Sequence, residues 1–192
     1  DFCLSRGLGD VYKRQSQYPR GAIKLFFTAN HDENSWNGTE YEKYGVATLA
    51  WAVFAFTWHG MPMVYSGQES PSKKRLKFFD KDLIEWNHPT QLHSFYQKLS
   101  NLRVNNPAIN KGESFILPSD KDNELMAFFR RSGNHIVLVL LNVSTQSRLK
   151  IHVHHEWLKG DFRNIFSGLV FHFNHKEAFE LQAGEYLVYE KI

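Results

Sequence analysis

Asn30, His31 and Asp32 are consecutive polar residues that follow a short apolar run, and their types are the ones in this sequence best suited to chemistry. A fixed carboxylate stabilises positive charge that develops in a transition state, and an imidazole can donate hydrogen bonds to hydroxyl groups. No Ser or Cys nucleophile pattern and no Gly-rich phosphate loop accompanies them. A His–Asp pair without cysteine or a spaced second His is a poor metal signature, so we expect no metal site here. Such residues also cap helices or bind each other, which leaves a structural interpretation open.

The elements around this group are expected to form a strand–helix–strand unit. The apolar run 22–29 has the composition of a buried parallel strand, and a long apolar helix is expected over 41–59. A second short strand is expected over 60–67, with Glu69 in a structural role at its polar end. The two strands of such a unit are parallel, so both polar ends lie on the same face, where parallel α/β folds usually have their sites.

The pattern changes near Asn106, where an amphipathic helix expected over 88–105 ends at Asn106-Pro107. Beyond it the hydrophobic period becomes two, as in an antiparallel β-sandwich. Three segments are therefore expected: a disordered or adapter-derived tail (1–15), an α/β part (16–105) and a β-sandwich (106–192). The strands of the sandwich are expected over 114–117, 125–130, 136–142, 149–154, 162–166, 170–173 and 186–190.

Composition excludes several classes of protein. The 192 residues carry a formal net charge of +3 with scattered basic residues, so no nucleic-acid partner is expected. The longest apolar stretch, 46–58, is shorter than the roughly 20 residues that span a bilayer, so no membrane partner is expected. The chain is too short for a complete (β/α)₈ barrel, which needs about 250 residues. Cys3 cannot form an internal disulfide, and the basic residues of 73–77 are expected in a solvated loop.

Two motifs carry a resemblance to a known family. FTANHD (27–32) resembles the fourth short sequence region of the α-amylase family of glycoside hydrolases, in which barrel strand seven ends in Asn-His-Asp. GMPMVYSGQE (60–69) is similar to the strand-eight segment of that family. The motifs occur in the family's order and are separated by one helix. KRLKFF and IEW, a helix and a β-sandwich follow, as they do at the end of the family's barrel and in its domain C.

The resemblance implies the terminal portion of a (β/α)₈ barrel followed by domain C, in a retaining enzyme that cleaves or transfers α-glucosidic bonds of starch, glycogen or maltodextrin. It implies that Asp32 is the carboxylate that stabilises the transition state and that His31 binds the sugar in the cleaved subsite. Asn30 and Trp36 are further candidates for substrate contact. The expected partner is an α-glucan or maltooligosaccharide. No cofactor is expected in this chain, although family members often bind calcium through parts of the barrel not present here.

The family's nucleophile and general acid have no counterpart in this sequence. Retaining chemistry needs two carboxyl groups roughly 5 to 5.5 Å apart, and in the family they follow strands four and five, which lie upstream. We therefore expect the isolated chain to be inactive. The alternative is a non-catalytic carbohydrate-binding or scaffolding relative of the family.

Overall fold

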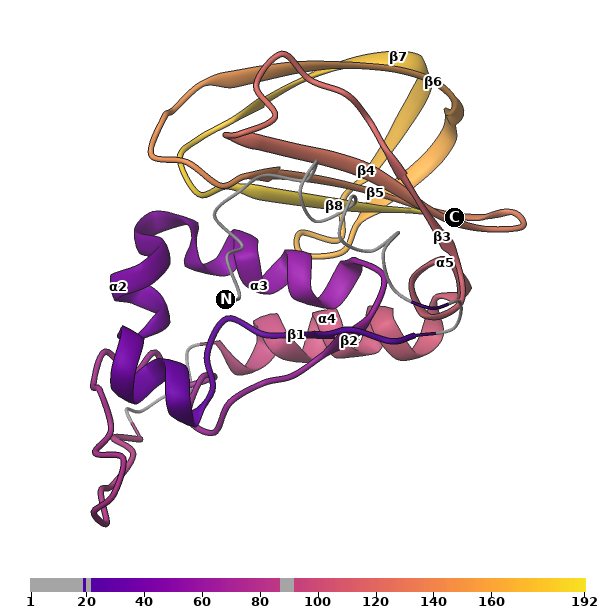
Figure 1. Cartoon of the computed structure of the whole chain (residues 1–192). Helices are drawn as coiled ribbons and strands as arrows, with labels where there is room; N and C mark the ends of the chain where they lie inside the picture. Colours follow the sequence, from indigo (N-terminus) through magenta and orange to yellow (C-terminus); the bar gives the residue numbers. More distant parts are fainter. Residues whose placement is uncertain (1–18, 20–21, 87–91) are drawn as a thin grey trace.

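The computed structural model describes Pro19, residues 22–86 and residues 92–192 (Figure 1). The expected tail 1–15 and the expected helix start at His88 lie outside these residues. In the first part of the described chain the elements are β1 (Leu25–Phe26), η2 (Glu33–Asn37), α2 (Glu40–Tyr44), η3 (Gly45–Ala47), α3 (Thr48–Thr57), β2 (Met61–Pro62), α4 (His93–Asn105) and α5 (Pro107–Asn110). The strands that follow are β3 (Glu113–Ile116), β4 (Leu125–Ser132), β5 (His135–Asn142), β6 (Leu149–Asn164), β7 (Val170–Leu181) and β8 (Tyr186–Lys191).

β1 and β2 pair in parallel, as the strand–helix–strand pattern predicts. Leu25 lies opposite Met61, and Phe26 lies opposite Pro62. Each strand is only two residues long, whereas the apolar runs are longer, because Phe27 and Ala29 are buried without being part of the ladder. Hydrophobicity in this region indicates burial rather than strand pairing. Gly60 permits the close approach of the strands, since a Cβ there would lie 2.5 Å from the Lys24 carbonyl oxygen.

The helical segment between the two strands is divided, although the sequence predicts one helix over 41–59. α2 begins with a capping box in which Thr39 and Glu42 satisfy each other's backbone N–H groups. It ends at Gly45, whose φ of 52° breaks the helix before α3 begins. α3 is buried on nearly all sides, so it is a core element rather than an amphipathic surface helix. In the described part of the chain, no helix is both long and apolar enough to cross a membrane.

The second half forms one antiparallel sheet with the strand order β3-β4-β5-β8-β6-β7. The long strands β6 and β7 lie over β4, β5 and β8, so the sheet has the two layers of the expected sandwich (Figure 1). The predicted strands 149–154 and 162–166 belong to the single strand β6, which has an irregularity between His154 and Lys159. The predicted strand 170–173 extends to Leu181. The structure thus confirms the fold class, with both layers belonging to one continuous sheet.

The described residues form two hydrophobic clusters, one on each face of strands β4 and β5. Phe54 of α3 and Trp58, the residue that follows the helix, pack against Phe128 of β4 in the helix-facing cluster, with ring centroids 6.3 and 4.8 Å apart. Phe129 belongs to the second cluster, between the layers of the sheet. Neighbouring residues of a strand point to opposite faces, so a run of buried residues serves both clusters. The helices and the sheet therefore share a core.

Candidate active site

Asn30 ends the buried segment after β1 and starts the next helical turn. Its side-chain oxygen accepts a hydrogen bond from the Glu33 backbone N–H at 2.7 Å, and its carbonyl accepts one from the Asn34 N–H at 2.9 Å. Asn30 therefore caps the helical turn, which is the structural role left open for the polar residues 30–32. Its predicted contact with substrate stays a prediction.

His31 and Asp32 point away from the protein interior. Their side chains are 72% and 56% exposed, and His31 Nε2 lies 3.6 Å from Asp32 Oδ1. Asp32 has helical backbone angles at the start of η2, but its carboxylate accepts no capping hydrogen bond there. The carboxylate and the imidazole thus lie side by side and open to solvent, just beyond the carboxyl end of a parallel strand. This arrangement suits groups that contact a ligand.

A buried polar network lies behind this exposed pair. Thr28 Oγ1 donates to Glu40 Oε2 at 2.5 Å, and Gln68 Nε2 lies 2.8 Å from the same oxygen. Gln68 Nε2 also lies 2.8 Å from the Tyr96 hydroxyl. Burial raises the pKa of Glu40 to about 7, although the hydrogen bonds from Thr28 and Gln68 and the charge of Lys43 oppose the shift. The network connects the end of β1 with α2, the segment after β2, and α4, so it fixes the backbone that carries Asp32.

Glu40 and its partners were not predicted as site residues. Gln68 belongs to the second motif, in which a structural role was expected for its neighbour Glu69. The signal that indicates Glu40 is the capping box: Thr39 and Glu42 mark the start of α2 and thereby place Glu40 in its first turn.

The segment after β2 is fastened to the segment after β1. The Asn34 amide accepts from the Leu76 N–H at 2.7 Å and donates to the Lys74 carbonyl at 3.3 Å. Ser35 Oγ donates to the Leu76 carbonyl at 2.7 Å. These hydrogen bonds hold residues 74–76 beside η2, next to the exposed pair.

An ion pair reinforces this attachment. Arg75 donates to both carboxylate oxygens of Glu42 over 2.9 to 3.1 Å. The hydrogen bonds from Arg75 and from the Thr39 backbone lower the pKa of Glu42 to about 2. The basic residues expected in a solvated loop thus include Arg75, which is engaged with α2.

Trp36, predicted to contact sugar, lies on the same surface as His31. Its side chain is 59% exposed. Phe78 lies between the two, with its ring centroid 5.2 Å from Trp36 and 6.1 Å from His31. The structure therefore brings His31, Asp32 and Trp36 to one surface and leaves Asn30 beneath it.

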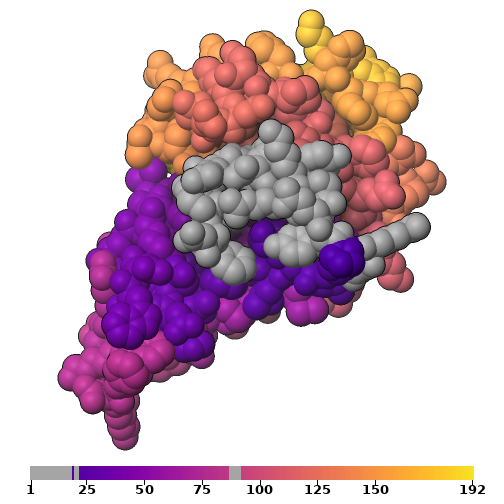
Figure 2. Space-filling model, viewed as in Figure 1, coloured from indigo at the N-terminus to yellow at the C-terminus, as the bar shows by residue number. Residues whose placement is uncertain are grey.

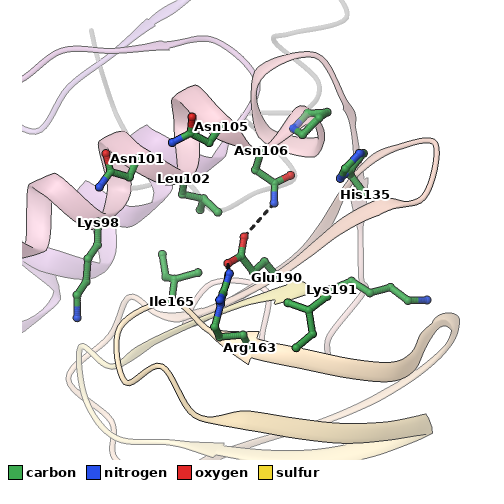
Figure 3. Close-up of a pocket in the computed structure, with 12 residues that line it drawn as sticks. Lys98, Asn101, Leu102, Asn105, Asn106, His135, Arg163, Ile165, Glu190 and Lys191 are labelled. Atoms are coloured by element: carbon green, nitrogen blue, oxygen red, sulfur yellow. Dashed lines mark hydrogen bonds and ion pairs between the residues drawn. The ribbon is translucent and has the colours of Figure 1, made fainter.

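A separate hollow of about 450 Å³ lies between α4 and the sheet (Figure 3). At its centre Glu190 accepts hydrogen bonds from Arg163 at 2.6 Å and from Asn106 at 3.2 Å. Both carboxylate oxygens are thus occupied by neighbouring side chains. The described residues that line this hollow include no Phe, Tyr or Trp. It does not contain His31 or Asp32, and its polar groups join the helices to the sheet.

Metal ligands are not grouped in the described residues. No cluster of three or more His, Cys, Asp or Glu side chains in residues 22–86 and 92–192 is placed to hold an ion. Calcium, which the resemblance implies for the family, is therefore assigned no residue and no step among the described residues.

The comparisons with curated proteins give relatives of one kind. A scan against protein-family models finds no match. The chain is 24% identical over 165 residues to Alpha-amylase 2 of Dictyoglomus thermophilum, covering 77% of this chain and 26% of that protein. It is 27% identical over 138 residues to Alpha-amylase MalA of Haloarcula japonica and to a Cyclomaltodextrinase of Bacillus sp., covering 67% and 68% of this chain. The chain spans about a quarter of the length of these relatives: 26%, 19% and 24%.

Solved structures show the same fold. The maltogenic α-amylase AmyB of Thermotoga neapolitana superposes with a TM-score of 0.77 at 22% identity, over 95% of this chain and 44% of that one. The α-amylase of Geobacillus thermoleovorans, crystallised with acarbose, has a TM-score of 0.76 at 18% identity, over 95% and 42% of the two chains. The relatives and the structural neighbours confirm the resemblance indicated by the two motifs: in sequence and in fold this chain is similar to α-amylase-family enzymes, of which it spans a part.

Proposed function

We propose that this chain forms the part of an α-glucan-acting retaining glycoside hydrolase that supplies the transition-state-stabilising carboxylate, Asp32. The observation that carries the proposal is the exposed Asp32–His31 pair at the carboxyl end of a parallel strand. During cleavage of a glycosidic bond, positive charge develops at the ring carbon and ring oxygen of the sugar. A fixed carboxylate facing that ring stabilises the transition state more than the ground state, which is the condition for catalysis.

The proposed substrate is an α-glucan or a maltooligosaccharide. Structural neighbours have been crystallised with acarbose, maltotriose and maltose. The imidazole of His31, 72% exposed beside the carboxylate, is placed to donate a hydrogen bond to a sugar hydroxyl. Asp32 then acts on the ring of the same sugar residue that His31 orients.

Other carboxylates near Asp32 do not replace the missing nucleophile and general acid. Glu33 pairs with Lys43 at 3.3 Å, and Glu40 is enclosed in the network behind the surface. Hydrolysis with retention needs a nucleophile and an acid on either side of the scissile bond. We therefore expect this chain alone not to hydrolyse maltooligosaccharides. We expect hydrolysis from a longer polypeptide of the same gene that also contains the nucleophile and the general acid.

The test compares both proteins on maltoheptaose, with Asp32→Asn as the decisive variant. Asp32→Asn in the longer polypeptide is expected to lower kcat by about 10²-fold or more, the loss typical of removing one group that stabilises transition-state charge. Asp161→Asn is the matched control, since Asp161 is also paired with a histidine and is 57% exposed, but lies on the sheet. Turnover that survives in Asp32→Asn would refute the catalytic role. A longer polypeptide that binds maltoheptaose without any turnover would identify a carbohydrate-binding relative instead.

A further inference from the structure

Three exposed aromatic side chains lie next to the Asp32–His31 pair. Trp36, Phe78 and Phe79, here named the aromatic wall, are 59%, 40% and 84% exposed. The ring centroids are 5.2 Å apart for Trp36 and Phe78, 6.1 Å for Trp36 and Phe79, and 4.8 Å for Phe78 and Phe79. Phe78 also stacks on His31, with 24° between the ring planes. The wall is therefore continuous with the proposed site.

The loop that carries Phe78 and Phe79 projects from the body of the molecule, whereas Trp36 belongs to η2 (Figures 1 and 2). It is nevertheless internally braced, because Lys74 Nζ pairs with Asp82 at 2.6 Å and donates to the Leu83 carbonyl at 3.2 Å. Asp82 also accepts from the Lys77 N–H at 3.1 Å. The hydrogen bonds of Asn34 and Ser35 to the same loop fix its base beside η2, which carries Trp36.

The composition of this surface fits a sugar better than a second protein. Partly exposed rings of this number offer about 400 Å² of surface, about half of the roughly 800 Å² per partner that a stable protein–protein interface buries. Glucose presents apolar C–H faces and a rim of hydroxyl groups, which match exposed rings beside polar side chains. Here the polar side chains are His31 and Asp32.

We propose that the aromatic wall is a stacking subsite for a glucose residue of the α-glucan that neighbours the one bound at Asp32. The inference rests on the proposed function, since Asp32 defines the neighbouring sugar. Phe79 and Trp36 supply the ring faces, and Phe78 couples them to His31.

The experiment measures the Kd of maltoheptaose for the whole 192-residue chain by ligand-observed NMR titration. Phe79→Ala and Trp36→Ala are each expected to raise Kd about fivefold, the loss that follows from removing one aromatic stacking contact. Phe79→Trp keeps a ring face and is expected to stay within about twofold of the wild type. The matched control is Phe115→Ala, which removes a ring that is 37% exposed on β3 and is expected to stay within about twofold. Thermal unfolding of each variant checks that the fold is retained.

Several results overturn the proposal. The first is that millimolar maltoheptaose does not saturate the wild-type chain. The second is that Phe79→Ala and the wild type have equal Kd values. The third is that the chain self-associates in sedimentation and that Phe79→Ala abolishes this association without changing Kd. The two hypotheses fail separately. Unchanged Kd in Phe79→Ala together with lost turnover in Asp32→Asn of the longer polypeptide rejects the wall alone. A raised Kd in Phe79→Ala with full turnover in Asp32→Asn rejects the catalytic role alone.

Discussion

Asp32 and Glu40 are close in sequence but have opposite environments. Asp32 is exposed beside His31, whereas Glu40 is 4% exposed and accepts hydrogen bonds from Thr28 and Gln68. A buried carboxyl group is more stable when protonated, because charge is costly to remove from water. The environment therefore makes Glu40 part of the scaffold and leaves Asp32 accessible to solvent.

Glu40 makes the stability of the chain depend on pH. Its pKa is about 7 in the folded protein, above the ordinary value of 4.5, so the folded state binds the proton more tightly than the unfolded state. Its contribution is fully present below pH 4.5 and is lost as the pH rises through 7. A shift of this size corresponds to ~3 kcal/mol. Glu40→Gln is therefore expected to raise the free energy of unfolding at pH 8 by up to that amount and to change it little at pH 4.5, as measured by urea denaturation.

Glu42→Gln is the control for this prediction. The folded-state pKa of Glu42 is lowered to about 2, so the contribution of Glu42 to stability is present above pH 4.5 and is lost as the pH falls through 2. Glu42→Gln should leave the slope of stability against pH between 5 and 7 as in the wild type. An unchanged slope in Glu40→Gln would show that Glu40 does not titrate in this range.

Among the elements, α5 depends on one buried guanidinium. Arg130 of β4 is 1% exposed and donates to the carbonyls of Ala108, Ile109 and Gly112 over 2.7 to 3.2 Å. Ala108 and Ile109 belong to this helix of four residues and Gly112 follows it, so these carbonyls lie where acceptors have no intrahelical partner. Burial lowers the pKa of Arg130 to about 10. The charge is thus retained at neutral pH and binds the helix end to the sheet.

Arg130→Met is expected to lower the free energy of unfolding by about 3 kcal/mol or more, because it leaves several buried carbonyls without a donor. The neighbouring substitution Arg131→Met is the control. Arg131 lies on the other face of β4, over the Trp157 ring at 4.5 Å, and its loss is expected to cost about 1 kcal/mol or less. Urea unfolding compares the two variants. Equal midpoints would mean that water satisfies the carbonyls of α5.

The elements could be predicted where local patterns decide them. The parallel pairing of β1 with β2 followed from the order of apolar runs, and the site roles of His31 and Asp32, taken from a short motif, stay predictions. Neither the division of the helix at Gly45 nor the continuity of β6 could be predicted from the sequence pattern. In β6, a bulge after His154 and the turn-like Gly160-Asp161 interrupt the hydrophobic period without ending the strand. Glu40 and Arg130 depend on partners distant in sequence, which no local window contains.

The aromatic wall shows the same dependence on distant contacts. In the sequence its loop is dominated by charge, and the two phenylalanines stand among lysines and aspartates. Lys74 and Arg75 pair with Asp82 and Glu42, and Phe78 and Phe79 are exposed in the same loop. The wall itself joins Trp36 of η2 to Phe78 and Phe79 of this loop, a contact between segments that no local window contains.

At the scale of the whole molecule, the helices and the sheet are not independent. The helix-facing cluster combines α3 and α4 with residues of β4, β5 and β8. The turn before β8 touches η3 closely, since a Cβ at Gly184, whose φ is 70°, would lie 2.1 Å from the Val46 carbonyl oxygen. The boundary near Asn106 stays a prediction, and the shared core crosses it.

Residues 106–192 expressed alone are therefore expected to be less stable than the full chain, although the strand pattern by itself suggests an independent sandwich. Without α3 and α4, one face of the sheet exposes large side chains, and exposed apolar surface of this kind drives aggregation. The expected readouts are binding of a hydrophobic dye and weak hydrogen-exchange protection in β4 and β5. The apolar side chains concerned are Met126, Phe128, Val137, Val139, Leu141 and Val188.

A variant of 106–192 with Phe128→Thr and Val139→Thr separates loss of the covering helices from loss of the sheet itself. Both side chains face the helices, whereas the cluster between the two layers of the sheet stays intact. Threonine has good strand propensity, so the variant is expected to bind less dye than unmodified 106–192 while keeping its strands. If unmodified 106–192 unfolds cooperatively at the same temperature as the full chain and binds no dye, the layered cluster alone is sufficient and the sheet is an autonomous domain.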